Sequence, residues 1–247
     1  MDTAREKVKN ANLRFYEAAA AHYDSIDPRR ARERFPWLES VLRSLHGAKE
    51  NAALLDAGAG SGFLLRHARG IFPRRIALDQ SPRMLERIRD EDVEKLVGSC
   101  EKIPLADGSV DVVAAFAVLH HLHDPLAFFS EAHRVLRKGG AVYTDHDLAA
   151  PFAHRFRWPL RIWRLLFDHG PEYLKIPEIS PDDYHWTEYH GNRGLDGEAW
   201  REPLTRLGFQ RIAVERHWLG GGAAEKVAVL LGLRKRGPFL RVTAWKD

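Results

Sequence analysis

Residues 54 to 62 read Leu-Leu-Asp-Ala-Gly-Ala-Gly-Ser-Gly, an apolar run that ends in Asp56 and continues into three alternating glycines. Gly58, Gly60 and Gly62 permit backbone angles that other residues avoid, and they let a ligand approach the main chain closely. A helical pattern follows from Phe63 to Arg69, and free N–H groups at the start of a helix favour negative charge. The stretch therefore predicts a strand, a ligand-binding turn and a helix.

Short apolar runs alternate with helical patterns through the rest of the chain, with no internal repeat. This alternation predicts an α/β fold, in which a parallel sheet is buried between helices. We expect strands at Ala52 to Asp56, Arg75 to Asp79, Val93 to Gly98, Val110 to Ala115, Ala141 to Asp145 and Phe209 to His217, and a last antiparallel strand at Pro238 to Trp245. We expect helices at Ala4 to His22, Phe63 to Arg69, Pro82 to Arg89, Pro125 to Arg137 and Ala223 to Leu231, with Gly139 and Gly140 closing the fourth.

Two common nucleotide-binding motifs do not match the glycine turn. A dinucleotide fingerprint, G-x-G-x-x-G, needs a glycine where Phe63 or Leu65 stands, and the Gly-Lys-Ser/Thr of a P-loop does not follow. The pattern D-x-G-x-G-x-G instead resembles motif I of the class I S-adenosylmethionine-dependent methyltransferases. In that family the loop cradles the methionine portion of the cofactor, which implies that Asp56 lies near its amino group.

The second predicted strand ends in Asp79, which Gln80 follows. A carboxylate at this strand end can accept hydrogen bonds from both hydroxyls of a ribose, with the spacing that nucleotide-binding folds use. The alternative is an acid that only stabilises the N-terminus of the next helix. Because the glycine turn and the acid agree in spacing, we expect Asp79 to bind ribose, with Gln80 beside it.

The segment Gly98-Ser99-Cys100-Glu101 resembles the adenine loop of the same family, of the type G-D-A-E-x-L-P-F. Ser99 stands where the family has aspartate, so its contact with the adenine amino group lacks charge assistance. Cys100 stands at the alanine position, and we interpret it as a small buried hydrophobic residue rather than a reactive thiol. The resemblance implies that Ser99, Cys100 and Glu101 contact the cofactor.

Two further segments extend the resemblance. Residues 119–125, Leu-His-His-Leu-His-Asp-Pro, are similar to the L-H-H-L-x-D-P segment of small-molecule methyltransferases that include the quinone-biosynthesis group. Residues 15–24 resemble an amino-terminal F-Y-D-x-x-A-x-x-Y-D in which tyrosines cover the cofactor, and ordinary helix packing is the alternative for Tyr16 and Tyr23. The family motifs span about residues 52–145, and Phe116 joins the implied cofactor contacts.

This resemblance implies S-adenosyl-L-methionine as cofactor and a Rossmann-like, seven-stranded, mostly parallel sheet with an antiparallel last strand. Helices would lie on both faces, and a helical and aromatic cap would be inserted after strand 5. We expect a single methyltransferase domain over residues 1–247, with a helical lid (1–50), a cofactor-binding core (51–147), a substrate-cap insertion (148–207) and C-terminal strands (208–247).

The chemistry asks little of the protein beyond alignment. The methyl group of the cofactor is already activated by a positive sulfonium, so the protein has to position a nucleophile and exclude water. A hydroxyl acceptor would also use a base, and histidine titrates near neutral pH. His121 and His146 follow predicted strands 4 and 5, at the sheet edge where ligands bind, and are the candidate bases. Residues 145–147, Asp-His-Asp, are metal-ligand types, but strand neighbours point to opposite faces, so we expect no metal.

Composition disfavours several other classes. The 247 residues carry a formal net charge of +4 and are 45% hydrophobic, which argues against disorder and gives no nucleic-acid signature. The single Cys100 excludes an intramolecular disulfide framework and favours a cytoplasmic location. We expect no secretory signal, and no apolar run approaches the roughly 20 residues that a bilayer requires. The N/D-P-P-Y/F segment of DNA and protein-amide methyltransferases does not follow strand 4, which disfavours those substrates.

The acceptor is suggested only by composition. Aromatic and basic residues alternate from Phe152 to Phe167, and polar aromatic residues gather at 184–191, which we expect to be a loop. These residues suit an aromatic, quinone-like or lipid-like small molecule, or contact with a membrane surface, and the alternative is a cap helix that buries its rings. We expect O- or C-methylation rather than N-methylation. Two competing classes are a non-catalytic cofactor-binding protein on the same fold, suggested by Ser99, and a nicotinamide-dependent oxidoreductase, disfavoured by Phe63.

Overall fold

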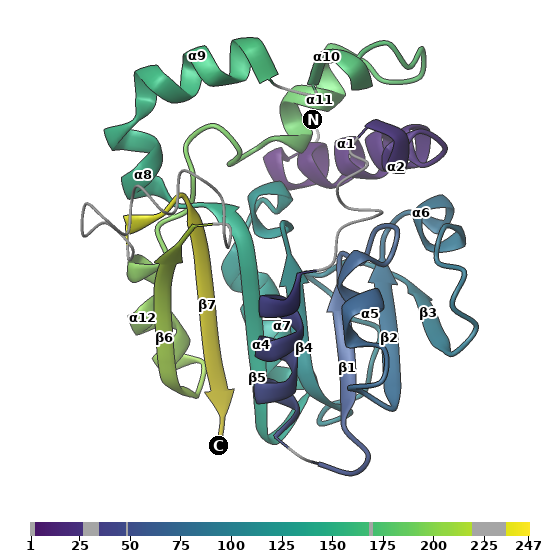
Figure 1. The fold of residues 1–247 in the computed structure, drawn as a ribbon, viewed down its shortest axis with the longest axis vertical. Coiled ribbons are helices and arrows are strands. Elements are labelled where there is room, and N and C mark those ends of the chain that lie inside the picture. Colours follow the sequence, from purple (N-terminus) through teal and green to yellow (C-terminus); the bar gives the residue numbers. More distant parts are fainter. Residues whose placement is uncertain (1–2, 27–34, 48, 168–169, 219–235) are drawn as a thin grey trace.

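A seven-stranded sheet forms the centre of the molecule, in the order β3-β2-β1-β4-β5-β7-β6 (Figure 1). The computed structural model describes residues 3–26, 35–47, 49–167, 170–218 and 236–247. The strands are β1 (Ala53–Ala57), β2 (Arg74–Asp79), β3 (Val93–Val97), β4 (Val110–Phe116), β5 (Leu136–Leu148), β6 (Phe209–His217) and β7 (Phe239–Lys246). Strands β1 to β5 are parallel, and β7 is antiparallel to both of its neighbours, β5 and β6. The predicted fold class is confirmed.

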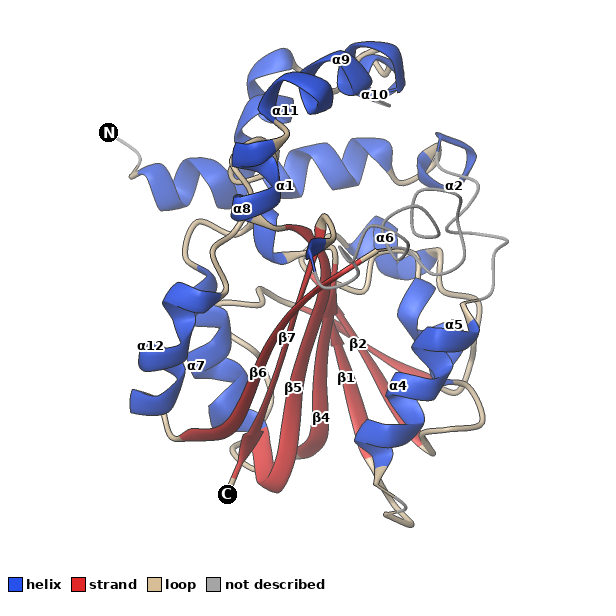
Figure 2. Cartoon of the chain, turned by 60° about the vertical axis from the view of Figure 1, so that its left-hand side comes forward, coloured by secondary structure: helices blue, strands red, loops and turns tan. Residues whose placement is uncertain are grey.

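Helices cover both faces of the sheet (Figure 2). One face carries α4 (Pro36–His46) and α5 (Phe63–Ala68), and the other carries α7 (Pro125–Val135) and α12 (Arg201–Arg206), which follows the short turn η2 (Glu198–Trp200). Each face has its own apolar core, with Leu38 and Leu64 in one and Phe128 and Leu204 in the other. The sheet is therefore buried on both sides, which agrees with the apolar strands of the sequence.

A further layer of helices lies over the edge at which the parallel strands end (Figures 1 and 2). It contains α1 (Ala4–Ala19), α2 (Tyr23–Ile26), α8 (Ala150–Arg155), α9 (Arg157–Phe167), α10 (Gly170–Tyr173) and α11 (Pro181–Thr187). Helix α1 begins with a capping box, in which Thr3 and Glu6 satisfy each other's backbone N–H groups. Phe15 of α1 packs against Tyr173 and Tyr184, with ring centroids 5.2 and 6.0 Å apart. These rings join α1 to the helices inserted after β5.

The end of α7 differs from the prediction. The helix stops at Val135 instead of Arg137, because Leu136 already pairs with Val110 in the sheet. The Nζ of Lys246 donates to the Leu136 carbonyl oxygen at 2.8 Å, which satisfies a carbonyl at this junction. Gly139 and Gly140 consequently lie inside β5 and do not close the helix.

The cap also differs from the prediction. The stretch 184–191, expected as a loop, begins in α11, for which the Ser180 hydroxyl accepts a hydrogen bond from the Asp183 N–H at 3.0 Å. In α9 the Trp158 side chain is 61% exposed, so the cap does not bury all of its rings. The predicted helix at Ala223 to Leu231 lies outside the described residues. Within the part of the chain that the structure describes, no helix is long and apolar enough to cross a membrane.

A buried carboxylate joins the antiparallel edge of the sheet to its parallel part. Asp145 of β5 is fully buried and accepts hydrogen bonds from Arg241 Nε at 2.8 Å, His217 Nε2 at 2.6 Å and the Tyr143 hydroxyl at 2.6 Å. Burial alone would raise the pKa of Asp145, but the hydrogen bonds and charges of His217 and Arg241, with the Tyr143 hydroxyl, lower it overall. The ionised carboxylate therefore links β5, β7 and β6.

We expect Arg241→Met to destabilise the protein by about 3–5 kcal/mol, because it leaves the Asp145 charge buried without its guanidinium partner. Chemical denaturation measures this loss. The double variant Asp145→Asn/Arg241→Met should cost clearly less than the sum of the two single variants, since both remove the same ion pair. Strictly additive losses would contradict the pairing.

Candidate active site

A cavity opens at the carboxyl ends of β1, β2 and β4, beneath α1 and α2. The chain order of the sheet reverses between β1 and β4, and ligands of open α/β sheets bind at such a point. The lining includes His121 and every predicted cofactor residue except Gly62: Tyr16, Tyr23, Asp56, Gly58, Gly60, Asp79, Gln80, Ser99, Cys100, Glu101 and Phe116. Val8, Lys9 and Asn12 of α1 line the same cavity.

The glycine turn is fixed between β2 and the segment after β4. The N–H groups of Gly58 and Ala59 both donate to the Leu78 carbonyl oxygen, at 2.8 and 2.9 Å. Gly58 has a φ of +77°, and a Cβ atom placed on it would lie 2.7 Å from Val118 Cγ2. Only glycine fits there, so the main chain itself forms the wall of the cavity.

Asp79 ends β2 at the cavity and is 9% exposed. Its Oδ2 accepts a hydrogen bond from the Gly60 N–H at 2.9 Å, and its Oδ1 accepts one from the Ser81 N–H at 2.9 Å. Burial raises the pKa of Asp79, while the backbone N–H groups of Ser81, Gly60 and Gln80 oppose the rise. A carboxylate has further acceptor positions beyond these two bonds, which suits the ribose hydroxyls of the predicted ligand.

Asp56 lies deeper in the same site, at the end of β1, and is 2% exposed. Burial and then the charge of Asp79 raise the pKa of Asp56 to about 8, and Arg66 opposes this shift. Two carboxylates thus repel each other in a desolvated cavity. A cation bound beside them would favour the ionised form of Asp56 and offset the repulsion.

Ser99 and Cys100 form the floor of the cavity on the β3 side. The Ser99 hydroxyl oxygen accepts a hydrogen bond from the Glu101 N–H at 3.2 Å, and Glu101 lies 3.3 Å from Arg5 Nη2. Burial, and next the charge of Asp79, raises the pKa of the Cys100 thiol far above its usual range. Cys100 is therefore a neutral, apolar part of the wall, in agreement with its interpretation from the sequence.

Two acidic side chains fasten α1 and α2 above the cavity. Glu17 accepts a hydrogen bond from the Ser81 hydroxyl at 2.5 Å, and Asp24 accepts one from the Ser61 hydroxyl at 2.8 Å. Ser61 lies in the glycine turn and Ser81 lies two residues after Asp79, so each bond joins a covering helix to a segment of the predicted cofactor site. Sequence reasoning noted the motifs that contain Glu17 and Asp24 but assigned these acids no role.

His121, in the turn η1 (Leu119–His121), forms a hydrogen-bonded pair with Tyr16 of α1. The His121 Nδ1 lies 2.7 Å from the Thr187 carbonyl oxygen, which can only accept, so Nδ1 carries a proton. In the neutral ring Nε2 then has the lone pair, and it accepts a hydrogen bond from the Tyr16 hydroxyl at 2.8 Å. The side chain of Asn12 donates to the His121 carbonyl oxygen at 2.8 Å and fixes the turn against α1. Sequence reasoning missed Asn12 and Thr187, since neither belongs to a motif.

Two predicted site residues lie outside the cavity lining. Gly62 has a φ of +80° and begins α5, and a Cβ atom on it would lie 3.0 Å from Ile88 Cγ1. The His146 ring is stacked between Phe116 and Phe239, with ring centroids 4.6 and 4.2 Å apart. Gly62 thus serves the turn and its packing, and Phe116 stands between His146 and the cavity.

The residues of this cavity fit S-adenosylmethionine. Its sulfonium and ammonium groups supply the positive charge that the buried Asp56 and Asp79 favour, and its ribose can donate to Asp79. The Gly58 turn leaves the main chain open to close approach. The sheet order and this site define a class I S-adenosylmethionine-dependent methyltransferase.

Comparisons with known proteins agree with this class. A family model described as a methyltransferase domain matches residues 55–144. The malonyl-[acyl-carrier protein] O-methyltransferase of Hahella chejuensis is 35% identical over 131 residues, which cover 51% of this chain and 45% of the relative. The demethylmenaquinone methyltransferase of Staphylococcus saprophyticus is 26% identical over 197 residues, which cover 76% of this chain and 82% of the relative.

The fold extends to solved structures of the same class. Phosphoethanolamine N-methyltransferase 2 of Haemonchus contortus, in complex with S-adenosyl-L-methionine, has a TM-score of 0.62 and 17% identity, covering 100% of this chain and 60% of that chain. The chain spans less than half the length of the first curated relative. Residues 55–144 therefore match the methyltransferase domain of class I S-adenosylmethionine-dependent methyltransferases, a class whose cofactor is S-adenosylmethionine.

We expect Asp56→Asn to stabilise the cofactor-free protein while weakening cofactor binding. The raised pKa means that the folded state holds a proton that the unfolded state releases, so Asp56 costs stability increasingly from about pH 4 to about pH 8. At about pH 8 the unfolding temperature should rise by about 2–4 °C, which corresponds to about 1 kcal/mol of added stability in a domain of this size. At about pH 5 the rise should be smaller.

The matched control for this variant is Asp111→Asn. Asp111 is also buried, but it pairs with Lys49 at 3.2 Å and Arg137 at 2.6 Å. This substitution should lower the unfolding temperature at about pH 8, because it removes an ionised partner of both cations. Thermal unfolding at both pH values measures the two variants, and a fall for Asp56→Asn would contradict its unfavourable charge.

We expect Asp79→Ala to weaken binding of S-adenosylmethionine about 10- to 100-fold, the effect of losing hydrogen bonds to a charged group. Titration calorimetry measures the dissociation constant. Asp92→Ala serves as the control. The Asp92 side chain is 82% exposed, so this substitution should leave the affinity for S-adenosylmethionine unchanged. An unchanged dissociation constant for Asp79→Ala would remove Asp79 from the site.

Proposed function

We propose that this protein transfers a methyl group from S-adenosylmethionine to a small-molecule acceptor, and that Tyr16 and His121 accept the proton of that acceptor. The observation that carries the proposal is the 2.8 Å hydrogen bond between the Tyr16 hydroxyl and His121 Nε2, inside the cavity that contains Asp56 and Asp79. Proton-accepting groups and cofactor-binding groups therefore face the same space.

When bound, S-adenosylmethionine supplies an electrophilic methyl group on a positively charged sulfur. The Tyr16 hydroxyl can pass its proton to His121 Nε2 while it takes a proton from an acceptor hydroxyl or carbon acid. The His121 ring then carries protons on both nitrogens, and the Thr187 carbonyl oxygen stabilises that form through Nδ1. Positioned acid–base groups of this kind contribute about 10²- to 10⁴-fold to a rate.

The acceptor class follows from what surrounds this pair. Val8, Phe116 and Leu122 provide apolar wall, while Lys9 and His123 add polar and basic groups to the same lining. An aromatic, quinone-like or lipid-like molecule with an acidic O–H or C–H group suits this mixture. The named reactions of two relatives, O-methylation of a malonyl group carried by a protein and methylation of a demethylmenaquinone, support O- or C-methylation over N-methylation.

The covering helices complete the proposal. Helices α1 and α11 would shield the reacting groups from water, with residues 1–50 and 148–207 acting as lid and substrate cap. His146 would support the site through its stack on Phe116 rather than act as the base. We place this activity in the cytoplasm on the basis of the single Cys100.

A non-catalytic cofactor-binding protein is the second candidate, favoured by the uncharged Ser99 in the adenine loop. Incubation with methyl-labelled S-adenosylmethionine and a panel of phenols, quinones, carboxylic acids and lipids separates the two functions. Label transfer to any acceptor supports the proposal. Tight cofactor binding without transfer to any of these acceptors supports the alternative.

We expect Tyr16→Phe and His121→Asn each to lower kcat by about 10²- to 10⁴-fold, because either change removes the proton acceptor. Steady-state kinetics on the best acceptor and calorimetry with S-adenosylmethionine measure kcat and cofactor affinity separately, and the loss should fall on kcat. The matched controls are Tyr189→Phe and His185→Asn, which change the same residue types outside the cavity lining. Retention of kcat in both test variants would contradict the role of the pair.

A further inference from the structure

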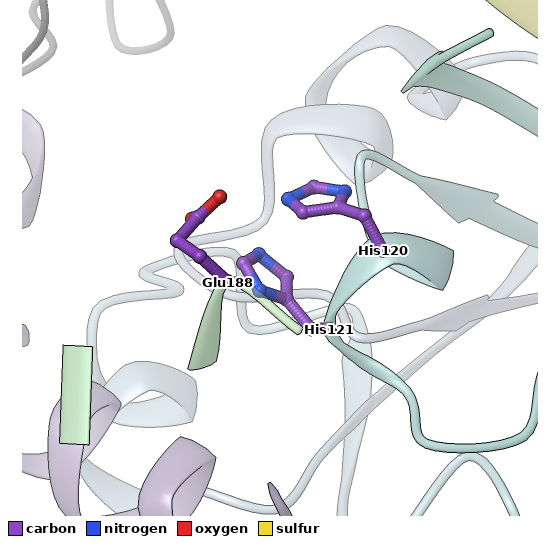
Figure 3. A group of neighbouring side chains, drawn as sticks. All are labelled: His120, His121 and Glu188. Atoms are coloured by element: carbon purple, nitrogen blue, oxygen red, sulfur yellow. The ribbon is translucent and has the colours of Figure 1, made fainter. Parts of the chain in front are cut away.

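Three potential metal ligands lie close together, and one of them, His121, also lines the cavity (Figure 3). His120 and His121 lie in the turn after β4, and Glu188 ends α11. Each offers one ligand atom, and the three atoms lie within 4.8 Å of one another. From the sequence we expected no metal, and the Asp-His-Asp run at 145–147 was the only set of ligand types proposed for one, so this group comes from the tertiary structure.

We propose that His120, His121 and Glu188 bind a divalent transition-metal ion of the zinc type. Two imidazoles and a carboxylate are the ligand set of many zinc sites, which leave a fourth position for water or substrate. Mg²⁺ and Ca²⁺ favour oxygen ligands, so the two histidines select against them. A tetrahedral site needs ligand atoms about 3.3 Å apart, so metal binding would draw the three side chains somewhat closer than the observed spacing of up to 4.8 Å.

Both histidines are oriented as metal ligands usually are. The His120 Nδ1 donates to Asp147 Oδ1 at 2.6 Å, and the Asp147 side chain is 1% exposed. The His121 Nδ1 donates to the Thr187 carbonyl oxygen at 2.7 Å. Carboxylate and carbonyl acceptors on one ring nitrogen place the lone pair on the other, Nε2, and raise its basicity toward a metal.

Metal binding would also affect methyl transfer, and this one step of the inference rests on the proposed function. A neutral His121 ring with a proton on Nδ1 has a single lone pair, and in the structure that lone pair accepts the Tyr16 hydroxyl. A metal ion on Nε2 would displace this hydrogen bond. Metal binding and proton transfer through Tyr16 therefore exclude each other, and the ion should act as an inhibitor.

Binding is tested on tag-free protein that has been freed of metal with a chelator. Calorimetry with Zn²⁺ should show one ion per chain, and Co²⁺ should give the visible absorption of a four-coordinate site. Glu188→Gln and His120→Gln should each weaken Zn²⁺ binding at least tenfold, and Asp147→Asn about 10- to 100-fold, the usual effect of losing a carboxylate behind a histidine ligand. His185→Gln is the control and should bind as the unchanged protein does, because His185 does not belong to the group.

Circular dichroism confirms that each variant is folded before its affinity is compared. Absence of stoichiometric Zn²⁺ binding would overturn the site. So would a Zn²⁺ affinity of Glu188→Gln and His120→Gln that equals that of the unsubstituted protein. Binding does not depend on turnover, so stoichiometric Zn²⁺ without any methyl transfer would support the site and contradict the proposed function.

Inhibition tests the competition with Tyr16 separately. In active protein, Zn²⁺ should inhibit methyl transfer reversibly. In His120→Gln, with inhibition measured against the zinc-free rate of that variant, the inhibition constant should be at least tenfold higher than in the unsubstituted protein. Methyl transfer that is unaffected at saturating Zn²⁺ would overturn the competition.

Discussion

The main constraint on this structure is the repulsion between two buried carboxylates at neighbouring strand ends. Asp56 and Asp79 lie in one desolvated cavity, and burial raises the pKa of both. Such a pair lowers the stability of the ligand-free protein. A positively charged ligand bound beside the two carboxylates would offset this loss. The parallel sheet makes the arrangement possible, because the carboxyl ends of β1 and β2 meet at the same edge. The glycine turn then brings the Gly60 N–H to Asp79.

The cover of the cavity depends on the same two segments. Glu17 of α1 accepts a hydrogen bond from Ser81, which lies two residues after Asp79. Asp24 of α2 accepts one from Ser61, which lies in the glycine turn. The four-residue helix α2 has no buried residue of its own, so the Asp24 bond anchors it to the glycine turn. Both bonds end on the segments after β1 and β2, which also line the cavity.

The chemistry of the acceptor side depends on one carbonyl group. The Thr187 oxygen assigns the proton to His121 Nδ1 and leaves a single lone pair on Nε2. That lone pair has two competing uses in our proposals, to accept the Tyr16 proton or to bind a metal ion with His120 and Glu188. Because Thr187 and Glu188 end α11, the inserted cap controls the turn after β4 as well as covering it.

The sequence by itself determined the positions of the strands, the glycine turn, and the placement of Asp56 and Asp79 at strand ends. These features are encoded by neighbours along the chain: apolar runs, alternating glycines and an acid at a strand end. The tertiary structure decided what distant contacts control. Leu136 joined β5 instead of α7 because it pairs with Val110, and His146 was separated from the cavity by its stack on Phe116. Local periodicity carries no information about such pairings, since their partners lie far away in the chain.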